Sequence, residues 1–467
     1  MVVAEFIPAG PLLGEVRVPG DKSVSHRALI LAALADGESL VRGLGSGADV
    51  ASSAACLRYL GVEVETTRNG EVVVRPPRGG LRPPSATLDA GNSGTTMRLL
   101  AGVLAGQPFR SRLDGDVSLR RRPMRRVTEP LRWMGAEVFS ERAGPDGGEE
   151  TAPLVIRGPV PPRPLAARAH TLSVASAQVK SCLLLAGLHA AGMTSVAEPF
   201  PSRDHTERML RLFGARVRSL PGAGAAVESE GRPNLHPAEV DIPGDFSSAA
   251  FWIAVGLLVP GSELRLPGVG VNPTRTGLLQ VLSRMGAGAH VVLENLREAA
   301  DGGEPTADIT VRALEPSRGT GPGRGGAAGG LTATRVSADE IPRLIDEIPV
   351  LAVVATQAEG RTVIEGAGEL RVKESDRLAA LCSQLARLGA RVQADGDALI
   401  IEGPTPLRPA DVDSGGDHRL ALALAVAALA ARSAGGRRPA RSTRVAGFEA
   451  AGISYPEFRR HLEALSR

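Results

Sequence analysis

Strongly apolar segments alternate along the chain with amphipathic ones at a regular interval. Six segments are apolar on nearly every helical face, which is typical of helices buried in a core; they span residues 25–37, 95–106, 179–192, 247–261, 348–360 and 418–431. Each is followed by a more polar segment, and five of these end in Leu-x-x-apolar-Gly, at glycines 61, 135, 214, 286 and 389. This pattern predicts an amphipathic helix, a glycine C-cap and a following strand.

The spacing of these glycines predicts six structural repeats. They lie 74, 79, 72 and 103 residues apart, and one further interval ends in the closing segment 454–467. Each repeat should contain one buried helix, one half-exposed helix and short strands. The long interval includes residues 301–330, which are rich in Gly and Pro, and we interpret this stretch as a flexible surface insertion.

Length and composition restrict the class of protein. The 467 residues are enough for two to three domains, and 43% hydrophobic with 22% charged residues excludes disordered, collagen-like and disulfide-framework chains. A net charge of +3 and 3% aromatic residues argue against a nucleic-acid partner. The three cysteines form no CxxC pair, the longest apolar run covers only residues 420–431, and the opening segment is unlike a signal peptide. We therefore predict a cytoplasmic protein without a membrane partner.

Lysine is rare in this chain. Only Lys22, Lys180 and Lys373 occur among 54 basic residues. Since Arg serves for nearly every other positive charge, a retained Lys indicates a need for a compact, titratable ammonium group. Chance retention is the alternative for each of them.

Small polar and charged residues precede most of the apolar segments. Helix N-termini present unpaired N–H groups, so several of them facing one cleft would bind anions. The alternative is that these residues are ordinary N-caps, which we favour for Asp21, Asp245 and Asp417. N-capping does not explain the cations interleaved with them.

Three motifs place cations at such helix starts. In GDKSVSHR (20–27), two cations at a helix N-terminus oppose the dipole, which indicates a bound phosphate or carboxylate. The glycines of GNSGTTMR (91–98) allow close backbone approach to an anion, although this sequence is also a common turn. SLRRRPMRR (118–126) is either a solvated or nucleic-acid face, or a helix start with Pro123 at the first position and Arg122 at the N-cap.

Two further motifs combine carboxylates with cations. LRVKESDRL (370–378) contains Lys373 and Arg377 four residues apart with Glu374 between them, and a surface ion-pair lattice is the alternative interpretation. LIDEIP (344–349) and GGDHRLAL (415–422) place charged residues directly against very apolar segments. Burying a charge is costly without a partner, so these residues are not expected to be ordinary surface charges.

Together with SAQVKS (176–181) and SRDHTERM (202–209), these motifs resemble, in this order, the 5-enolpyruvylshikimate-3-phosphate synthase family, also called 3-phosphoshikimate 1-carboxyvinyltransferase, in its GDKS-type subgroup. The similarity extends from about Gly14 to Pro456. It implies an α/β fold of two domains with three repeats each, and an active site in the interdomain cleft. One domain would comprise residues 1–20 and 244–467, and the other residues 21–243.

The resemblance also implies an activity. Members transfer the enolpyruvyl group of phosphoenolpyruvate to the 5-hydroxyl of shikimate 3-phosphate and release phosphate, on the shikimate pathway to chorismate and the aromatic amino acids. The reaction uses neither metal nor organic cofactor, and we expect a monomer without a nucleic-acid partner. Two substrates bring two phosphates and two carboxylates, which matches the cations of the motifs.

Site residues carry over by position in the motifs. Those matching the shikimate 3-phosphate site are Lys22, Ser23, Arg27, Ser176, Gln178, Ser202, Asp346 and Lys373. Those matching the phosphoenolpyruvate site are Lys22, Gly94, Arg122, Gln178, Arg377 and Arg419. The chemistry requires an acid and a base; by resemblance Asp346 is the base for the hydroxyl, Glu374 protonates the methylene carbon, and Lys22 stabilises charge at both substrates.

The chain departs from the family pattern at a few positions. Ile453 stands where many members have a Lys that contacts phosphoenolpyruvate, so one cation is missing. Ala177 and Asp21 replace serines seen in some members. Gly94 is retained where some members insensitive to glyphosate, a competitor of phosphoenolpyruvate, have Ala, which predicts that this chain is a glyphosate target.

Three other functions remain to be weighed. The sister transferase acting on UDP-N-acetylglucosamine typically uses a cysteine in its first half, but the chain has none between Cys56 and Cys182. An RNA-end-processing or RNA-binding protein could use the arginine run, although net charge and aromatic content disfavour it. A purely anion-binding repeat protein would not need Asp346 and Glu374 in addition to the cations.

Overall fold

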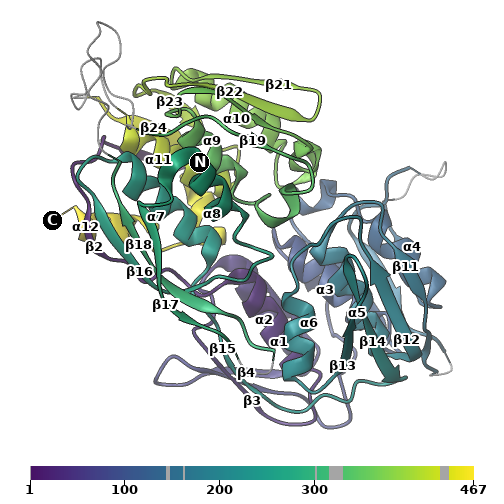
Figure 1. Ribbon diagram of the computed structural model, residues 1–467. Coiled ribbons are helices and arrows are strands. Elements are labelled where there is room, and N and C mark those ends of the chain that lie inside the picture. Colours follow the sequence, from purple (N-terminus) through teal and green to yellow (C-terminus); the bar gives the residue numbers. More distant parts are fainter. Residues whose placement is uncertain are drawn as a thin grey trace, which may run out of the picture. The chain divides into compact units, whose positions relative to one another are not determined.

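The computed structural model describes residues 2–142, 148–160, 163–299, 302–314, 330–431 and 441–466. Contacts within the chain divide it into two units (Figure 1). Unit 1 contains residues 1–19, 244–297 and 305–467, and unit 2 contains residues 20–243 and 298–304. The chain therefore changes unit at 19/20 and 243/244, at or next to the predicted domain limits.

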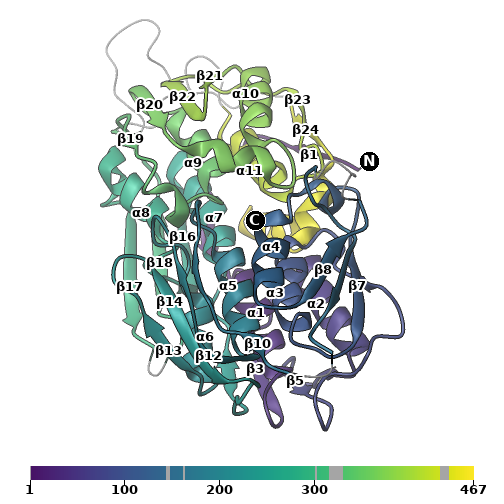
Figure 2. The ribbon, with the colours of Figure 1, turned by 90° about the vertical axis from the view of Figure 1, so that its right-hand side faces the viewer.

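The six apolar segments form helices that are buried over nearly their whole length. Unit 2 contains α1 (Lys22–Ala32), α3 (Gly94–Leu104) and α5 (Ala177–Gly187), and unit 1 contains α7 (Phe246–Leu258), α9 (Ile348–Ala355) and α11 (His418–Ala430). In unit 2, α3 packs against α1 and α5, and in unit 1 the three helices contact one another (Figures 1 and 2). Each triplet forms the centre of its unit's hydrophobic core. None of the described helices is long and apolar enough to cross a bilayer.

The amphipathic segments form the second helix of each repeat. These are α2 (Ala48–Tyr59), α4 (Arg125–Trp133), α6 (His205–Leu212), α8 (Gly277–Leu282), α10 (Arg377–Arg387) and α12 (Phe458–Leu465). The five repeat glycines have φ between +85° and +98°, the left-handed conformation of a helix C-cap. The predicted six-repeat organisation is confirmed.

Each repeat of unit 2 adds a small mixed sheet. The strand orders are β15 (Glu239–Asp241), β3 (Ser39–Arg42), β5 (Val72–Arg75), β4 (Glu63–Thr66); then β6 (Leu88–Asp89), β7 (Arg110–Asp114), β9 (Leu154–Arg157), β8 (Glu137–Ser140); then β10 (Leu165–Ala166), β12 (Ala190–Ala197), β14 (Gly224–Glu230), β13 (Arg216–Ser219), with β11 (Ala169–Thr171) also on β12. In each order the first two strands are parallel and the others antiparallel.

Unit 1 repeats this sheet pattern with both ends of the chain. Its orders are β17 (Val291–Arg297), β18 (Thr306–Arg312), β16 (Glu263–Gly270), β2 (Leu13–Glu15); then β19 (Arg335–Val336), β20 (Gly360–Ile364), β22 (Ala398–Gly403), β21 (Arg391–Asp395); then β1 (Val3–Phe6), β24 (Thr443–Ala446), β23 (Asp411–Asp413). Strand β1 pairs antiparallel with β24, and β2 pairs parallel with β16. These pairings explain why the first nineteen residues belong to the same unit as the C-terminal half.

The prediction of a surface insertion over residues 301–330 is wrong for part of that stretch. Thr306–Arg312 is strand β18, which lies between β16 and β17, and its five central residues are buried. The apolar and β-branched residues of ADITVR match a strand, but the adjacent Gly/Pro-rich sequence dominated the interpretation. Residues 301 and 315–329 lie outside the described residues.

Residues 298–304 add two crossings between the units that the sequence did not predict. They follow β17 and precede β18, both in unit 1, yet their contacts assign them to unit 2. Glu304 lies 2.7 Å from the imidazole Nδ1 of His205 in α6, and Arg208 donates to the carbonyl of Gly303. The predicted assignment of the whole span 244–467 to one domain is therefore wrong for this short segment.

Candidate active site

The aspartates at three buried-helix starts are N-caps. Asp21, Asp245 and Asp417 each accept a hydrogen bond at 2.9 Å from a backbone N–H two or three residues further along. This confirms the capping interpretation that we favoured for these residues. Asp245 and Asp417 also form ion pairs with the buried Arg275 and Arg377, so these two residues are more than N-caps.

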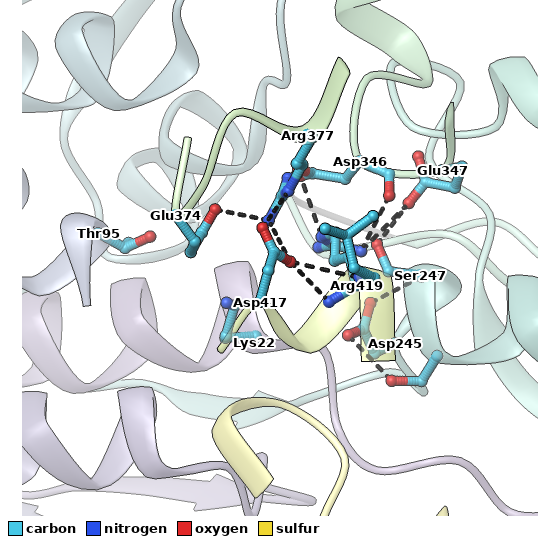
Figure 3. Close-up of polar contacts among 12 residues, drawn as sticks. Lys22, Thr95, Asp245, Ser247, Asp346, Glu347, Glu374, Arg377, Asp417 and Arg419 are labelled. Carbon is cyan, nitrogen blue, oxygen red and sulfur yellow. Dashed lines mark hydrogen bonds and ion pairs between the residues drawn. The ribbon is translucent and has the colours of Figure 1, made fainter. Parts of the chain in front are cut away.

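Arg377 is the centre of a charged cluster in unit 1. Its side chain, at the first position of α10, is 1% exposed. Its Nε lies 2.7 Å from Asp417 Oδ2, its Nη2 lies 2.5 Å from Glu374 Oε2, and its Nη1 lies 3.4 Å from Asp346 Oδ1 (Figure 3). Burial alone would lower the pKa of Arg377, but the three carboxylates raise it above its usual value. A buried, charged guanidinium thus joins the predicted base and the predicted acid.

Two other arginines reach Asp346. The Nε of Arg419 lies 3.4 Å from Asp346 Oδ1, and Nη1 of Arg275 lies 3.9 Å from Asp346 Oδ2. Arg419 follows the cap of α11, and Arg275 lies in the loop between β16 and α8. Asp346 is therefore a carboxylate faced by guanidinium groups from three separate segments. Figure 3 labels two of these groups, Arg377 and Arg419.

Arg275 and Glu347 lie in the same charged group as Asp346, and neither of them was singled out from the sequence. Arg275 is 3% exposed and also lies 3.2 Å from Asp245 and 3.4 Å from Glu347. Glu347 is fully buried and accepts a hydrogen bond from the Ser247 hydroxyl. Nothing in the local sequence distinguishes Arg275 from the many other arginines. A single signal was available for Glu347, its position directly before a very apolar helix.

Carboxylates outnumber guanidinium groups in this cluster, which we call the Arg377 cluster. Its members are Asp245, Asp346, Glu347, Glu374 and Asp417 with Arg275, Arg377 and Arg419. The motifs had indicated cations whose burial requires a bound anion, but here the protein supplies the negative charge. An anionic ligand must therefore compete with carboxylates for the same N–H donors.

Lys22 and Arg27 are likewise paired within unit 2. The ammonium of Lys22, the first residue of α1, lies 2.8 Å from Asp49 Oδ2 in α2. Arg27 donates to the hydroxyls of Thr206 and Ser181 at 2.6 and 2.7 Å and to the carbonyl of Ser23 at 2.8 Å. Burial lowers the pKa of Arg27 to about 10, although nearby carboxylates counteract it.

The GNSG motif forms the start of α3, where two arginines converge. A Cβ placed on Gly94 would lie 2.8 Å from Arg98 Nη1 and 3.0 Å from Arg122 Nη1. Arg98 donates to Gln178 Oε1 at 2.6 Å, and Gln178 donates to the Thr95 hydroxyl at 3.0 Å. The structure thus brings together Gly94, Arg122 and Gln178, three predicted phosphoenolpyruvate residues. Arg98, the last residue of the GNSGTTMR motif, was missed.

The predicted helix start at Pro123 is wrong. Helix α4 begins at Arg125 with Met124 as its N-cap, and Arg122 instead follows a 3₁₀ turn over Leu119–Arg121. The Met124 N–H bonds to the carbonyl of Glu150, outside the helix. From this turn Arg122 reaches the start of α3 beside Gly94 and donates to Asn92 Oδ1 at 2.8 Å.

Ser176 and Ser202 are joined by one carboxylate. Ser176 is the N-cap of α5, and its N–H donates to Glu198 Oε1 at 2.9 Å. The buried Ser202 hydroxyl donates to Glu198 Oε2 at 2.8 Å. Two predicted shikimate 3-phosphate residues therefore have a common partner that the sequence did not indicate.

Lys373 and Ile453 each lie at an end of a 3₁₀ helix. Lys373 follows Ala367–Val372 and is half-buried, and Ile453 is the last residue of Phe448–Ile453. LRVKESDRL does not form a surface ion-pair lattice on one helix, because Lys373 lies before α10 and Arg377 is buried. Among the described residues there is no group of three or more His, Cys, Asp or Glu arranged to hold a metal ion.

Comparison with solved structures defines the class of protein first. The fold matches that of EPSP synthase from Acinetobacter baumannii with a TM-score of 0.79 at 38% identity, covering 99% of this chain and 98% of that one. It also matches the enolpyruvyl transferase NikO from Streptomyces tendae with a TM-score of 0.72 at 20% identity, over 99% and 97% of the two chains. The two-unit, six-repeat architecture is thus the enolpyruvyl transferase fold.

Sequence comparison then identifies the family. The model of the EPSP synthase (3-phosphoshikimate 1-carboxyvinyltransferase) family matches residues 7–462. The 3-phosphoshikimate 1-carboxyvinyltransferases of Gloeobacter violaceus and Geobacillus kaustophilus are 50% and 48% identical over 457 residues, which is 97% of this chain and 97% and 98% of those proteins. The chain belongs to the EPSP synthase family, and it is a transferase of the shikimate pathway.

Proposed function

We propose that this chain transfers the enolpyruvyl group of phosphoenolpyruvate to the 5-hydroxyl of shikimate 3-phosphate and releases phosphate. The observation that carries the proposal is the buried Arg377, which contacts both Asp346 and Glu374. Anion binding alone requires only cations, whereas this cluster also contains the two carboxylates that proton transfer requires. Membership in the EPSP synthase family supports the same reaction.

The two carboxylates perform complementary proton transfers. The methylene carbon of phosphoenolpyruvate must gain a proton before C2 becomes electrophilic, and the attacking hydroxyl must lose one. Glu374 gives its proton to the methylene carbon while Asp346 takes the hydroxyl proton, and a C–O bond forms at C2. Glu374, now a carboxylate, then takes a proton back from the methyl group as the C–O bond to phosphate breaks, which restores the double bond and releases phosphate.

Glu374 can act as an acid only when its partner is engaged elsewhere. Its carboxylate lies 2.5 Å from Arg377, and this contact stabilises the ionised form. An anionic group of phosphoenolpyruvate that takes over the Arg377 donors removes that stabilisation. Binding of this substrate therefore prepares the acid for the reaction.

The proposed binding residues follow the motif positions. Shikimate 3-phosphate is held by Lys22, Ser23, Arg27, Ser176, Gln178, Ser202, Asp346 and Lys373, and phosphoenolpyruvate by Lys22, Gly94, Arg122, Gln178, Arg377 and Arg419. The planar guanidinium groups suit phosphate and carboxylate oxygens because they can donate two parallel hydrogen bonds. Arg98, which lies beside Gly94, adds a cation to a site that has Ile453 in place of a lysine.

The thiols of the chain disfavour the sister reaction on UDP-N-acetylglucosamine. Cys56 and Cys182 are buried, and burial raises the pKa of each to about 12. A buried thiol with a raised pKa is a poor nucleophile or proton donor for a substrate in solution. All three cysteines are unpaired, which fits the cytoplasmic location that we propose. We also propose that the protein is a monomer of 48.4 kDa, which light scattering can test.

Phosphate release from phosphoenolpyruvate, measured with and without shikimate 3-phosphate, tests the proposal. We expect release only when both substrates are present, together with a product whose mass is that of the enolpyruvyl adduct. Release with UDP-N-acetylglucosamine and none with shikimate 3-phosphate would assign the chain to the sister reaction. Binding of both substrates without turnover would make it a binding protein.

A further inference from the structure

Lys180 is the one lysine to which no substrate contact is assigned. Its side chain is 3% exposed, and its ammonium lies 2.8 Å from Glu198 Oε2 and 2.8 Å from Glu207 Oε1. The two carboxylate side chains are 0% and 5% exposed. Burial alone would lower the pKa of Lys180, but the two carboxylates raise it, so the ammonium stays charged. Lys180 thus balances two buried carboxylates inside unit 2.

Glu198 connects this buried group to the proposed substrate site. The same carboxylate accepts the Ser176 N–H and the Ser202 hydroxyl, and Ser176 is the N-cap of α5. Lys180 lies one turn further along α5, so the contacts form a closed ring from the helix through Glu198 back to its N-terminus. One carboxylate therefore sets the position of two segments, the start of α5 and the loop before α6.

We propose that Lys180 and Glu198 are positioning residues for shikimate 3-phosphate. The ammonium balances the charge of Glu198, so that the carboxylate can hold Ser176 and Ser202 without repelling the substrate's phosphate. This inference rests on the proposed function, because the role of the two serines is part of it. In this proposal Lys180 and Glu198 act through the two serines and not on the reacting atoms.

The same arrangement explains why a lysine is retained here. An ammonium is compact and carries three N–H donors in different directions, so it can bridge two enclosed carboxylates. A guanidinium is larger and planar, and the site is almost closed to solvent on all sides. Lys180→Arg is therefore expected to raise the KM for shikimate 3-phosphate although the charge is kept.

Glu207 provides a matched control for Glu198. Both carboxylates are buried and both lie 2.8 Å from the same ammonium. Among the described residues, the Ser176 N–H and the Ser202 hydroxyl donate hydrogen bonds to Glu198. Glu207 forms its ion pair with Lys180. Replacing either by Gln leaves the other paired with Lys180. The two variants differ in the link to the serines, which only Glu198→Gln removes, and in the negative charge near Arg27, which only Glu207→Gln removes.

The test compares the kinetics of Glu198→Gln and Glu207→Gln with those of the wild type. We expect Glu198→Gln to raise the KM for shikimate 3-phosphate about tenfold, the scale of one lost hydrogen bond to a charged group, with kcat and the KM for phosphoenolpyruvate within about twofold. Glu207→Gln should lower thermal stability by a similar amount but raise the KM for shikimate 3-phosphate less than about threefold. Glu198→Asp, which keeps the charge and loses the reach, should behave like Glu198→Gln and serves if that variant does not fold.

Several outcomes separate this inference from the proposed function. A wild type that releases no phosphate in the presence of shikimate 3-phosphate overturns the proposed function, and the inference with it. An active wild type together with unchanged KM values in Glu198→Gln and Glu198→Asp overturns the inference alone. Equal KM increases for Glu198→Gln and Glu207→Gln would reduce the network to a structural role and also overturn it.

Discussion

Asp346 faces three guanidinium groups, so its removal separates proton transfer from charge balance. Asp346→Asn keeps the size of the side chain and leaves Arg275, Arg377 and Arg419 in place. We expect the dissociation constant of shikimate 3-phosphate to stay within about tenfold and turnover to fall ~100-fold or more, the scale of a lost general base. Calorimetry and phosphate release measure the two quantities.

The exposed Asp339 supplies the control for Asp346→Asn. Asp339→Asn should change neither the dissociation constant of shikimate 3-phosphate nor turnover. If binding and turnover of the Asp346 variant fall by the same factor, Asp346 holds the ligand and the base lies elsewhere.

Lys22 tests whether charge alone is sufficient at the start of α1. Its side chain is 15% exposed and its ammonium is 2.8 Å from Asp49. We expect Lys22→Arg to abolish turnover, because a planar guanidinium cannot approach both substrates as a compact ammonium does. The reverse exchange in an exposed ion pair, Arg42→Lys, should leave phosphate release unchanged. Near-normal activity of Lys22→Arg would make Lys22 a replaceable positive charge.

Gly94 determines how closely a ligand can approach the start of α3. A methyl group there would lie 2.8 and 3.0 Å from the far ends of the Arg98 and Arg122 side chains and would meet no backbone atom of another described segment within 3.9 Å, so the variant should fold. We expect Gly94→Ala to raise the inhibition constant of glyphosate far more than the KM for phosphoenolpyruvate. An insensitive wild type that this substitution leaves unchanged would show that Gly94 does not decide inhibition.

At the scale of elements, α3 and α5 are held together by the close approach of their backbones. A Cβ on Gly102 in α3 would lie 2.2 Å from the carbonyl oxygen and 3.1 Å from the Cα of Cys182 in α5, and neither atom can move without its helix. We expect Gly102→Ala to lower the free energy of unfolding by about 2–3 kcal/mol, the cost of overpacking a core. Denaturant unfolding measures it.

Gly148 is the matched position for that substitution, because a Cβ there meets no atom within 4 Å. Gly148→Ala should leave the unfolding free energy unchanged. Equal stability of the Gly102 variant and the wild type would show that α3 and α5 can separate without cost.

Element existence and element limits differ in how well local sequence predicts them. The six apolar helices follow from segments that are apolar on nearly every face, and their partner helices follow from an amphipathic pattern that ends in a glycine C-cap. Strand β18 was missed because seven residues of strand signal lie beside a much longer Gly/Pro-rich stretch. A helix start at Arg122 was one of two interpretations of this segment, since Pro123 permits one, but the cap is Met124, whose carbonyl accepts the helical hydrogen bond of the Thr128 N–H.

At the scale of the whole molecule, the thiols report on the integrity of both cores. Cys182 lies in the core of unit 2 with Cys56, whereas Cys382 packs at the edge of the core of unit 1 and is partly buried. We expect the partly buried Cys382 to react with a disulfide reagent before the other two thiols in the native enzyme, although burial raises its pKa, and all three to react after denaturation. Rapid reaction of all three thiols in the native state would show that the core of unit 2 opens. Because the three cysteines are unpaired, a reductant should not change activity.

What the sequence by itself determined is the repeat, the buried and half-exposed helices, the N-caps and the motifs that resemble a transferase family. These depend on neighbours in the chain, and the helix period and capping preferences act over a few residues. Only the tertiary structure decided which charges meet. Arg275 reaches Asp346 and Glu347 from a distant loop, Arg98 reaches Gln178, and Glu198 joins Ser176, Ser202 and Lys180. Such pairings depend on where long side chains end in space, because burial forces each charge to find a partner irrespective of its position in the sequence.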